Sequence, residues 1–530
     1  MICEEKPKSV PDLINDYLAE NYRYWKKESI DKEEKTDHSI VVEFICNHPR
    51  FMILNGLIGK ILQKKYKCRL IAAVPEWNME IGMNVAKSFK FDEYVYLDQN
   101  FNFDLKINLS SLLEAKTIEE KRKNLLNFSI DGIKIGDIAY DTYLRTEKKS
   151  SIFAIDQKVT DHLAATIRFW KFYDSLVKSK NVLGGVLSHT YYTEYAPLAR
   201  SILANEGVVF SHQANHLRCY DKLDELCDNI YTISKSEFDI VYQNYQKEAI
   251  HSAEKYLDTE VITINKKNPS YASDAYGSHK KIYSRKELYD VAKFDQDKPT
   301  VGVMSHVFSD AVHSVRSMVY DDYYQWLVET LEIIKDIPTV NWLIKGHPSN
   351  IRYGVVESAE EITKPYSDKY KHISICPTDL NTGCLFDILK CVVTVSGTAG
   401  YEFPTQGIPA ICASENHYSE LGFVHKAESE TAYKEILYRV KDLQPLTEDQ
   451  KNRAKIFVYC LRDLGSVPSN LTLARIDNFG DKYDIPAMWK EARDRVKNYC
   501  LEDDPFYKNF MIQLEYNLPR LLNFDKIGIK

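Results

Sequence analysis

Buried-strand patterns alternate with helical patterns along the first half of this chain. Short runs rich in Val, Ile and aromatic residues predict strands, and stretches with apolar residues three or four apart predict helices between them. The predicted strands are residues 39–46, 69–74, 94–97, 185–189 and 208–212, and the predicted helices are 52–65, 81–89, 157–178 and 194–205. Alternation of this kind is typical of a parallel sheet covered by helices.

A second alternating series follows a polar stretch at residues 271–299, which we interpret as a link. Its predicted strands are 300–304, 340–344, 372–376 and 392–395, its helices 323–334 and 385–389, and two further helices, 486–499 and 504–522, end the chain. The expected fold is therefore α/β, with two Rossmann-like, doubly wound parallel-sheet domains facing a cleft and C-terminal helices. The expected boundaries are 1–37 for a charged, helical extension, 38–285 and 286–475 for the two domains, and 476–530 for helices packing back across them.

Composition narrows the class of partner and the compartment. The chain has 530 residues and a net charge of -7, and its longest basic patch, residues 64–69, is short, so we expect no nucleic acid partner. The eleven cysteines are odd in number and never spaced Cys-x-x-Cys, which favours reduced thiols over disulfides or a zinc site. No apolar run reaches the length of a membrane span and the first residues lack a signal-peptide core, so we expect a cytoplasmic protein.

The strongest motif runs from Cys391 to Glu402, where a β-branched strand enters the small-residue turn Ser396-Gly397-Thr398. We expect this turn to leave backbone N–H groups free at the start of a helix, which suits a phosphate. A second strand ends in Lys345-Gly-His347-Pro348. Each motif has a simpler reading: the turn as a plain helix cap, and the histidine as an ordinary loop residue.

In an open α/β sheet, ligands collect beyond the carboxyl ends of the strands. That rule selects a set of polar residues in the second domain, and a lysine, a histidine and a group of N–H donors there would bind a phosphate without a metal. The set is Ser305, His306, Asp310, His313, Lys345, His347, Ser349, Pro377, Thr378, Asp379, Asn381, Ser396, Thr398 and Glu402.

The paired motifs, with the later Gly407-Ile-Pro409, resemble the donor half of GT-B glycosyltransferases that build bacterial capsules and surface polysaccharides. The resemblance is nearest to the Kdo transferases and the sialyl- and polysialyltransferases, whose His-Pro and Ser/Thr motifs bind the phosphate of a CMP-sugar. It implies a catalytic role for His347 in departure of the nucleotide. It also implies a donor-binding set that comprises His306, Lys345, His347, Pro348, Thr378, Asn381, Ser396, Gly397, Thr398 and Glu402.

Within that set the resemblance places Ser396 and Thr398 on the phosphate, Glu402 on the ribose hydroxyls, and residues 377–381 near the base. Sialyltransferases commonly have adjacent Ser/Thr residues where this chain has Ser-Gly-Thr. A UDP-linked donor is therefore an alternative to a CMP-linked one. Glu402 also has a simpler role open to it, as a first-turn partner of its own helix dipole.

The first domain is expected to bind the acceptor and supply the general base. Its candidates are the loop 47–50, the stretch 131–145, which resembles a recurrent element of surface-carbohydrate proteins, and the strand-end residues His189 and His212. The catalytic candidates are Asp137, Asp141, His189, Asp310 and His347. Asp141 and Arg145, four residues apart, could equally form a helix salt bridge.

The sequence therefore predicts a glycosyltransferase that moves a sugar, with an acidic sugar such as Kdo or sialic acid first, from a nucleotide donor to a bacterial surface glycan or glycolipid. We expect no metal and no cofactor besides the donor. A lipid-linked acceptor would bring the protein to the inner face of the cytoplasmic membrane, through residues around 520–530. The alternatives are a CDP-glycerol-type polyol-phosphate transferase, a UDP-sugar epimerase and a non-catalytic partner in a capsule assembly complex.

Overall fold

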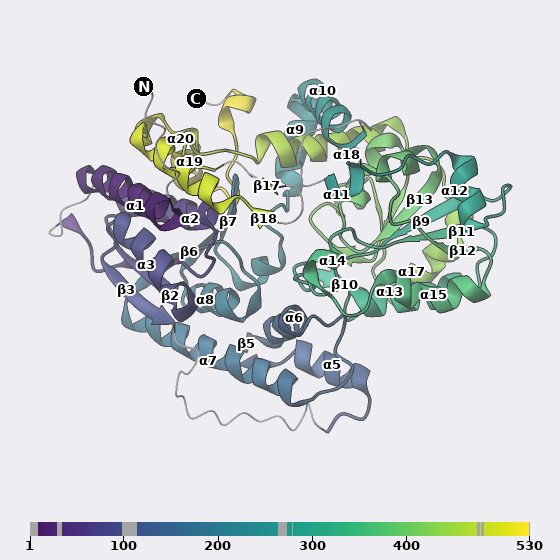
Figure 1. Cartoon of the computed structure of the whole chain (residues 1–530), viewed down its shortest axis with the longest axis horizontal. Helices are drawn as coiled ribbons and strands as arrows, with labels where there is room; N and C mark the ends of the chain where they lie inside the picture. Colours follow the sequence, from purple (N-terminus) through teal and green to yellow (C-terminus); the bar gives the residue numbers. More distant parts are fainter. Residues whose placement is uncertain are drawn as a thin grey trace.

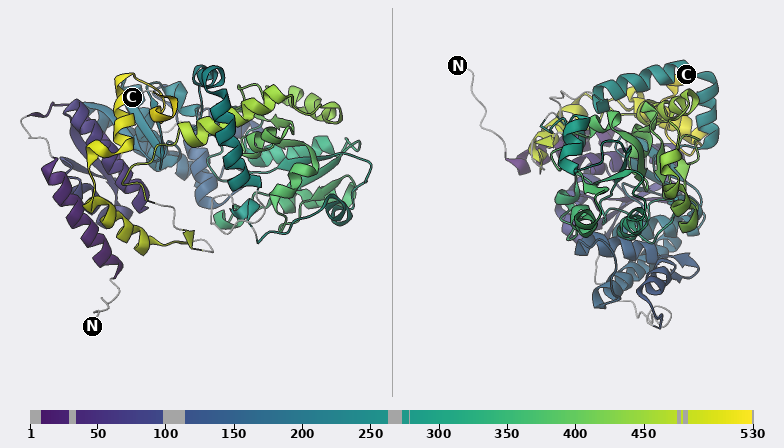
Figure 2. Two further views of the ribbon diagram at one scale, coloured as in Figure 1. Left: turned by 90° about the horizontal axis from the view of Figure 1, so that it is seen from above. Right: turned by 90° about the vertical axis from the view of Figure 1, so that its right-hand side faces the viewer.

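Two α/β halves lie side by side in the computed structural model (Figures 1 and 2). The structure describes residues 9–28, 34–97, 114–262, 273–277, 279–473, 477–478 and 482–528. The C-terminal helices, drawn in yellow, return to the purple N-terminal end of the chain instead of staying with the second half (Figure 1).

The first half is built on a six-stranded sheet in the order β3-β2-β1-β6-β7-β8. The strands are β1 (Ser39–Glu43), β2 (Arg69–Pro75), β3 (Glu93–Leu97), β6 (Val182–Leu187), β7 (Val208–Gln213) and β8 (His216–Tyr220). All neighbours are parallel except β7 and β8, which form a hairpin. Its covering helices are α2 (Pro49–Tyr66), α3 (Met79–Ser88), α7 (Gln157–Ser179) and α8 (Tyr192–Ala204).

The second half has a wholly parallel six-stranded sheet in the order β12-β11-β9-β13-β14-β16. Its strands are β9 (Thr300–Met304), β11 (Asn341–Lys345), β12 (Ile373–Ile375), β13 (Leu389–Thr394), β14 (Ala410–Cys412) and β16 (His425–Lys426). The helices are α12 (Arg285–Ala292), α13 (Tyr323–Ile334), α14 (Asn350–Tyr353), α15 (Ala359–Lys369), α16 (Ala399–Glu402) and α17 (Glu430–Tyr438), and a small ribbon pairs β10 (Ser317–Met318) with β15 (Ser414–Glu415).

The strand orders show why the alternating sequence pattern was informative. Counted within each half, both sheets run 3-2-1-4-5-6, the doubly wound order. Central strands such as β1 and β9 are buried along their whole length, as their continuous apolar runs predict. The predicted α/β class of two Rossmann-like sheets with C-terminal helices, the GT-B arrangement, is confirmed.

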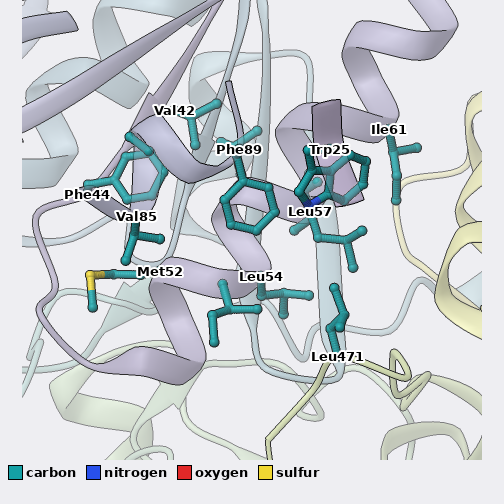
Figure 3. Packing of buried hydrophobic residues seen from close by; sticks show 14 of the residues in the cluster. Trp25, Val42, Phe44, Met52, Leu54, Leu57, Ile61, Val85, Phe89 and Leu471 are labelled. Atoms are coloured by element: carbon teal, nitrogen blue, oxygen red, sulfur yellow. The ribbon is translucent and has the colours of Figure 1, made fainter. Parts of the chain in front are cut away.

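The two ends of the chain share one hydrophobic core with the first sheet. Helix α1 (Val10–Lys27) packs against α19 (Ile485–Lys497), and α20 (Pro505–Glu515) places Phe510 5.6 Å from Phe210 of β7. Trp25 of α1 lies 5.5 Å from Phe89, among the aliphatic side chains of α2 (Figure 3). The segments expected as an extension and as helices crossing both domains therefore contribute to the core of the first half.

A helical insertion of the first half shares its core with the second sheet. It consists of α5 (Ile118–Leu126), the hairpin β4 (Ser129–Ile130) and β5 (Ile133–Lys134), and α6 (Gly136–Glu147). Tyr140 and Leu144 of α6 belong to the same apolar cluster as Trp326 and Trp342 of the second half. A further cluster packs α9 (Lys235–Asn244) and α10 (Gln246–Tyr256) against α18 (Glu448–Tyr459). The packing thus ties the halves together on two sides.

Four local expectations were wrong or incomplete. The polar link contains a capped helix, α12, whose Leu288 and Tyr289 are buried in the second half. The helix expected at 385–389 is a 3₁₀ turn, Thr382–Asp387, and β13 already begins at Leu389. The last helix ends at Glu515 rather than near 522. The helix after β13 has four residues, because Pro404 cannot continue it and Gly407 turns the chain at φ 84°.

At Gly136 the backbone of α6 lies very close to the backbone of Leu125 in α5. A Cβ atom there would lie 1.6 Å from the carbonyl oxygen of Leu125, a backbone atom that cannot move away alone. We expect Gly136→Ala to lower the free energy of unfolding by about 2 kcal/mol or more in urea denaturation. Lys123→Ala, on the exposed side of α5, is the control and should change it by less than about 0.5 kcal/mol. Equal stability of the two variants would contradict this packing.

Candidate functional site

Each doubly wound sheet has one crevice where the strand order reverses, and ligands bind there. In the first sheet it lies between β1 and β6, and in the second between β9 and β13. Loops after the strands of both sheets contact each other: the hydroxyl of Tyr192, after β6, donates to Oδ1 of Asp310, after β9, at 3.2 Å. The two crevices therefore open toward a common region.

His306 fills the reversal point of the second sheet. Its Nε2 accepts the backbone N–H groups of Val395 at 3.2 Å and Ser396 at 3.4 Å, and lies 3.1 Å from Oγ1 of Thr394. Its ring stacks on Tyr323 at 4.2 Å between centroids. Burial, and then the neighbouring His347, lowers the pKa of His306 to about 3. The ring is thus neutral near pH 7, and its proton is on Nδ1.

This arrangement corrects the expected anion site at Ser396-Gly397-Thr398. The N–H of Ser396 is directed to His306, and the N–H of Gly397 donates to Oγ1 of Thr394 at 3.3 Å. The helix that follows has only four residues, so its dipole is small. The turn therefore provides fewer free N–H groups than its sequence suggested, and it serves mainly to place His306 and Ser396.

Lys345 and His347 add a cation and a hydrogen-bond donor at the end of β11. Lys345 ends β11, and in the part of the chain that the structure describes its ammonium group forms no ion pair or hydrogen bond, although the charge of Glu360 acts on it from further away. Burial lowers the pKa of Lys345. Burial, and then Lys345, lowers the pKa of His347 to about 4. Because Nδ1 of His347 accepts the N–H of Ser349 at 3.2 Å, the neutral ring carries its proton on Nε2.

Buried polar groups around these two residues lack partners. The hydroxyl of Ser305 and both polar atoms of the Asn350 side chain are buried without a hydrogen bond among the described residues. Ser305 directly follows β9, and its N–H donates to the carbonyl of Lys345 at 2.9 Å. Unsatisfied buried groups beside an unpaired ammonium group indicate a site that is completed by a ligand. A ligand that carries negative charge and accepts hydrogen bonds would satisfy Lys345 and the Ser305 hydroxyl.

The other residues predicted to bind the donor differ in how far they are buried. Pro348 is half-buried beside His347, whereas the side chain of Thr378 is exposed and its carbonyl accepts from Lys280 at 2.7 Å. Asn381 is buried as a structural cap, donating to the carbonyls of Tyr276 and Gly277. Its predicted contact with a base therefore has no free amide group.

Glu402 is also enclosed. It is 3 % exposed, and its Oε2 accepts the hydroxyl of Tyr276 at 2.7 Å. Burial raises the pKa of this carboxyl group, while Tyr276 opposes the rise. The position predicted to hold ribose hydroxyls is thus occupied by a tyrosine hydroxyl in this structure. The simpler role agrees with the structure, because Glu402 lies in the first turn of α16 and its carboxyl group also interacts with Thr398 at the start of that helix.

The reversal point of the first sheet has its own polar cluster. Glu43 ends β1 and accepts the N–H of Ser188, after β6, at 2.9 Å. The Ser188 hydroxyl contacts both Glu43 and Nδ1 of His189, the latter at 2.9 Å. Asn55 joins Glu43 to His212, whose Nε2 lies 2.7 Å from the amide oxygen. Sequence reasoning selected both histidines but missed Glu43 and Ser188, although a glutamate closing a buried apolar strand was a visible signal.

The three predicted aspartates are engaged in ion pairs. Arg200 binds both oxygens of Asp137, at 2.8 and 2.7 Å, and although burial opposes it, this pairing holds the pKa of Asp137 well below its ordinary value. Asp310 pairs with Arg145 at 3.6 Å. A carboxylate so held is a poor proton acceptor, so Asp137 is corrected from candidate base to structural ion pair.

Asp141 links the two halves. Its Oδ1 lies 2.6 Å from Nδ1 of His313, and its Oδ2 accepts the backbone N–H of His313 at 3.1 Å. Burial alone would lower the pKa of His313, but Asp141 outweighs it and raises the pKa to about 9. The helix salt bridge expected between Asp141 and Arg145 is wrong, because Asp141 pairs with His313 and Arg145 with Asp310. A carboxylate with both oxygens engaged is a poor candidate for the general base.

One well-defined cavity lies away from both crevices. Its volume is about 860 Å³, and α5, the β4–β5 hairpin and residues 313–321 line it. Of the predicted catalytic residues only Asp137 borders it, and that carboxylate is paired with Arg200.

Among the described residues no three His, Cys, Asp or Glu side chains are grouped to hold a metal ion. Nor does any described helix combine the length and apolarity that crossing a membrane requires.

No protein-family model matches the sequence, and a search of curated proteins finds no match. Among solved structures, the chain is similar to Thermosulfurimonas dismutans KpsC, a β-Kdo 2,7 transferase, at 13% identity over 62% of this chain and 89% of that one, with a TM-score of 0.32. It is also similar to the Neisseria meningitidis UDP-GlcNAc 2-epimerase bound to UDP-GlcNAc, at 13% identity over 80% and 95%, with a TM-score of 0.25. Similarity this low assigns no family, so the site is interpreted from its own geometry.

Proposed function

We propose that this chain is a glycosyltransferase that binds a nucleotide-sugar donor in the second half and transfers the sugar to a surface-glycan acceptor held by the first half. The observation that carries the proposal is the Lys345 ammonium group, which forms no ion pair among the described residues and lies beside the neutral His347, itself next to the neutral His306. Phosphate is the anion that such a donor set at a strand end fits.

The donor side of the reaction follows from these groups. As the bond between sugar and phosphate breaks, negative charge grows on the phosphate oxygen. The Nε2–H of His347 and the ammonium group of Lys345 would stabilise that charge, in a crevice where burial strengthens the interaction. Neither group needs a metal ion to do so.

Charge balance supports a CMP-linked donor, as the sequence resemblance implies. Lys345 forms no ion pair among the described residues, whereas Lys426 at the end of β16 is paired with Glu420 at 2.6 Å. The charges of Lys280 and Glu360 also act on Lys345, and their opposite signs leave one net positive charge there. The phosphodiester of a CMP-sugar carries one negative charge, whereas the diphosphate of a UDP-sugar carries two. The acidic sugar and the acceptor remain part of the proposal on the resemblance alone. Membrane attachment through surface residues around 520–530 is corrected for Arg520, which is 3 % exposed and pairs with Glu237 at 3.7 Å.

A panel of CMP, CDP, UDP and GDP in a thermal shift assay tests nucleotide binding. We expect CMP at about 100 times its Kd to stabilise the fold by about 2.7 kcal/mol. Absence of a shift with every nucleotide would refute the proposal. Transfer from CDP-glycerol alone would favour a polyol-phosphate transferase, and interconversion of a free UDP-sugar without acceptor would favour an epimerase.

His347→Ala tests the role in leaving-group departure. We expect kcat to fall roughly 10²-fold or more while the unfolding temperature stays within about 2 °C, because the ring is only half-buried and its removal leaves no enclosed cavity. His372→Ala is the matched control, since His372 precedes β12 at the amino ends of the strands, away from the crevice, and its ring bonds the Ile334 carbonyl at 3.1 Å. Normal turnover by His347→Ala would contradict the assigned role.

A further inference from the structure

A buried carboxylate organises the reversal point of the first sheet. Four donors converge on Glu43: the N–H of Ile45 at 2.6 Å, the amide of Asn55 at 2.9 Å, the N–H of Ser188 at 2.9 Å and the Ser188 hydroxyl. An ionised carboxylate accepts only, and four donors satisfy its lone pairs. Glu43 is 0 % exposed, so the contacts also fix its position.

This set of contacts determines which nitrogen of His189 carries the proton. The Ser188 hydroxyl has one hydrogen, and the Glu43 carboxylate, which cannot donate, takes it. Ser188 must then accept from its other neighbour, Nδ1 of His189, at 2.9 Å. With the proton on Nδ1, Nε2 of His189 keeps a free lone pair. Glu43 therefore sets the tautomer of His189 through one intervening hydroxyl.

The free lone pair of His189 is accessible. Nε2 has no hydrogen-bond partner among the described residues and is not one of the buried unpartnered atoms, so solvent reaches it. The rings of Phe51 and Tyr195 lie 5.6 and 5.0 Å from the imidazole and limit its rotation. The ring is thus held with one nitrogen fixed and the other open.

His212, which Asn55 links to Glu43, has no accessible ring nitrogen. Its Nε2 is bonded to Asn55, and its Nδ1 is buried without a partner. The residue is 0 % exposed, so no acceptor can reach either nitrogen. Of the two histidines that the sequence selected at these strand ends, only His189 has the access that proton transfer requires.

We propose that His189 is the general base of the transfer and that Glu43, acting through Ser188, is its positioning residue. The inference rests on the proposed function. In a direct displacement, Nε2 takes the proton of the acceptor hydroxyl, whose oxygen forms a bond to the anomeric carbon with the freed electron pair. The bond from that carbon to the donor phosphate breaks, and its electrons leave with the nucleotide. The imidazolium then returns its proton to water.

The charges around His189 come from both halves. Burial lowers its pKa, the carboxylates of Glu43 and Asp310 raise it, and Arg145 lowers it, with a net lowering. His212 is neutral near pH 7, because burial lowers its pKa to about 3. His189 is therefore also neutral near pH 7, as a general base must be.

Ser188→Ala breaks the link while keeping both other residues. Without the acceptor for Nδ1–H, the imidazolium loses a partner and the tautomer is no longer fixed. We expect kcat to fall roughly tenfold and the acidic limb of the kcat/KM profile to move down by roughly 0.5 to 1 pH unit. Ser201→Ala is the matched control, because Ser201 is equally buried and its hydroxyl has no partner.

His189→Gln should lose roughly 10²- to 10⁴-fold in kcat.

Nitrogen NMR of histidine-labelled protein reads the tautomer without any substrate, with the His189→Gln spectrum assigning the resonance. We expect protonated Nδ1 and bare Nε2 in the wild type, and a mixture in Ser188→Ala. Protonated Nε2 in the wild type, or an unmoved acidic limb in Ser188→Ala, would overturn the positioning role, and an active His189→Gln would overturn the base. If no nucleotide shifts the wild-type unfolding temperature, the proposed function fails and the base role with it, whereas the tautomer result still decides the part of Glu43.

Discussion

Lys345→Met is expected to remove most of the affinity for nucleotide while leaving the free protein at least as stable as the wild type. The methionine keeps the apolar stem and deletes the ammonium group. Losing one partner of a buried ion pair costs about 2 to 4 kcal/mol, so Kd should rise roughly 30- to 1,000-fold. The free protein no longer buries an uncompensated charge, so its unfolding temperature should stay or increase.

Calorimetric titration with CMP measures the first effect and thermal denaturation the second. Lys390→Met is the matched control: Lys390 lies near the amino end of β13, opposite the carboxyl ends that form the crevice, and donates to the Leu443 carbonyl at 2.7 Å. The control should bind nucleotide as the wild type does. Wild-type affinity in Lys345→Met would mean that the unpaired ammonium group is not the phosphate ligand.

Stability is expected to decline on the alkaline side of neutrality because of the Asp141–His313 pair. The pKa of His313 is raised to about 9 in the folded protein, against about 6.5 for an unfolded histidine. A raised folded pKa stabilises the fold fully below pH 6.5, and this contribution is lost as the pH rises through about 9. The loss should be on the order of 3 kcal/mol.

Urea denaturation of the wild type and of His313→Asn at pH 6, 7.5 and 9 measures this contribution. The asparagine can still donate to Asp141 but does not titrate, so its stability should vary much less across the series. His251→Asn, on the exposed face of α10, should follow the wild type. A parallel decline in wild type and His313→Asn would show that the pair is not the cause.

Local sequence patterns predicted the strands and the strand-end residues of the donor side of the site. Strands such as β9 and β13 were legible because both of their faces are buried, which leaves uninterrupted apolar runs. Lys345, His347 and His306 were selected because polar residues at the carboxyl ends of parallel strands lie at the ligand edge of a sheet. The reversal point that brings His306 to Ser396 depends only on strand order, which the alternating pattern constrains.

The aspartates show where such reasoning stops. Asp137 and Asp141 occur in a motif with a typical catalytic composition, and nothing nearby in the sequence reveals their partners. Arg200 lies 63 residues from Asp137, and His313 lies 172 residues from Asp141. A carboxylate becomes a base or a structural ion pair according to the charge beside it, and folding decides that charge.

By itself, the sequence determined the α/β class, the two doubly wound halves and the strand ends that carry Lys345, His347 and His189, because periodicity and strand termini are local properties of the chain. Only the tertiary structure decided that the N–H groups of Ser396 and Gly397 are already used, that Lys345 forms no ion pair among the described residues, and that Glu43 reaches His189 through Ser188. Hydrogen bonds and ion pairs between distant segments depend on packing, which local patterns do not encode.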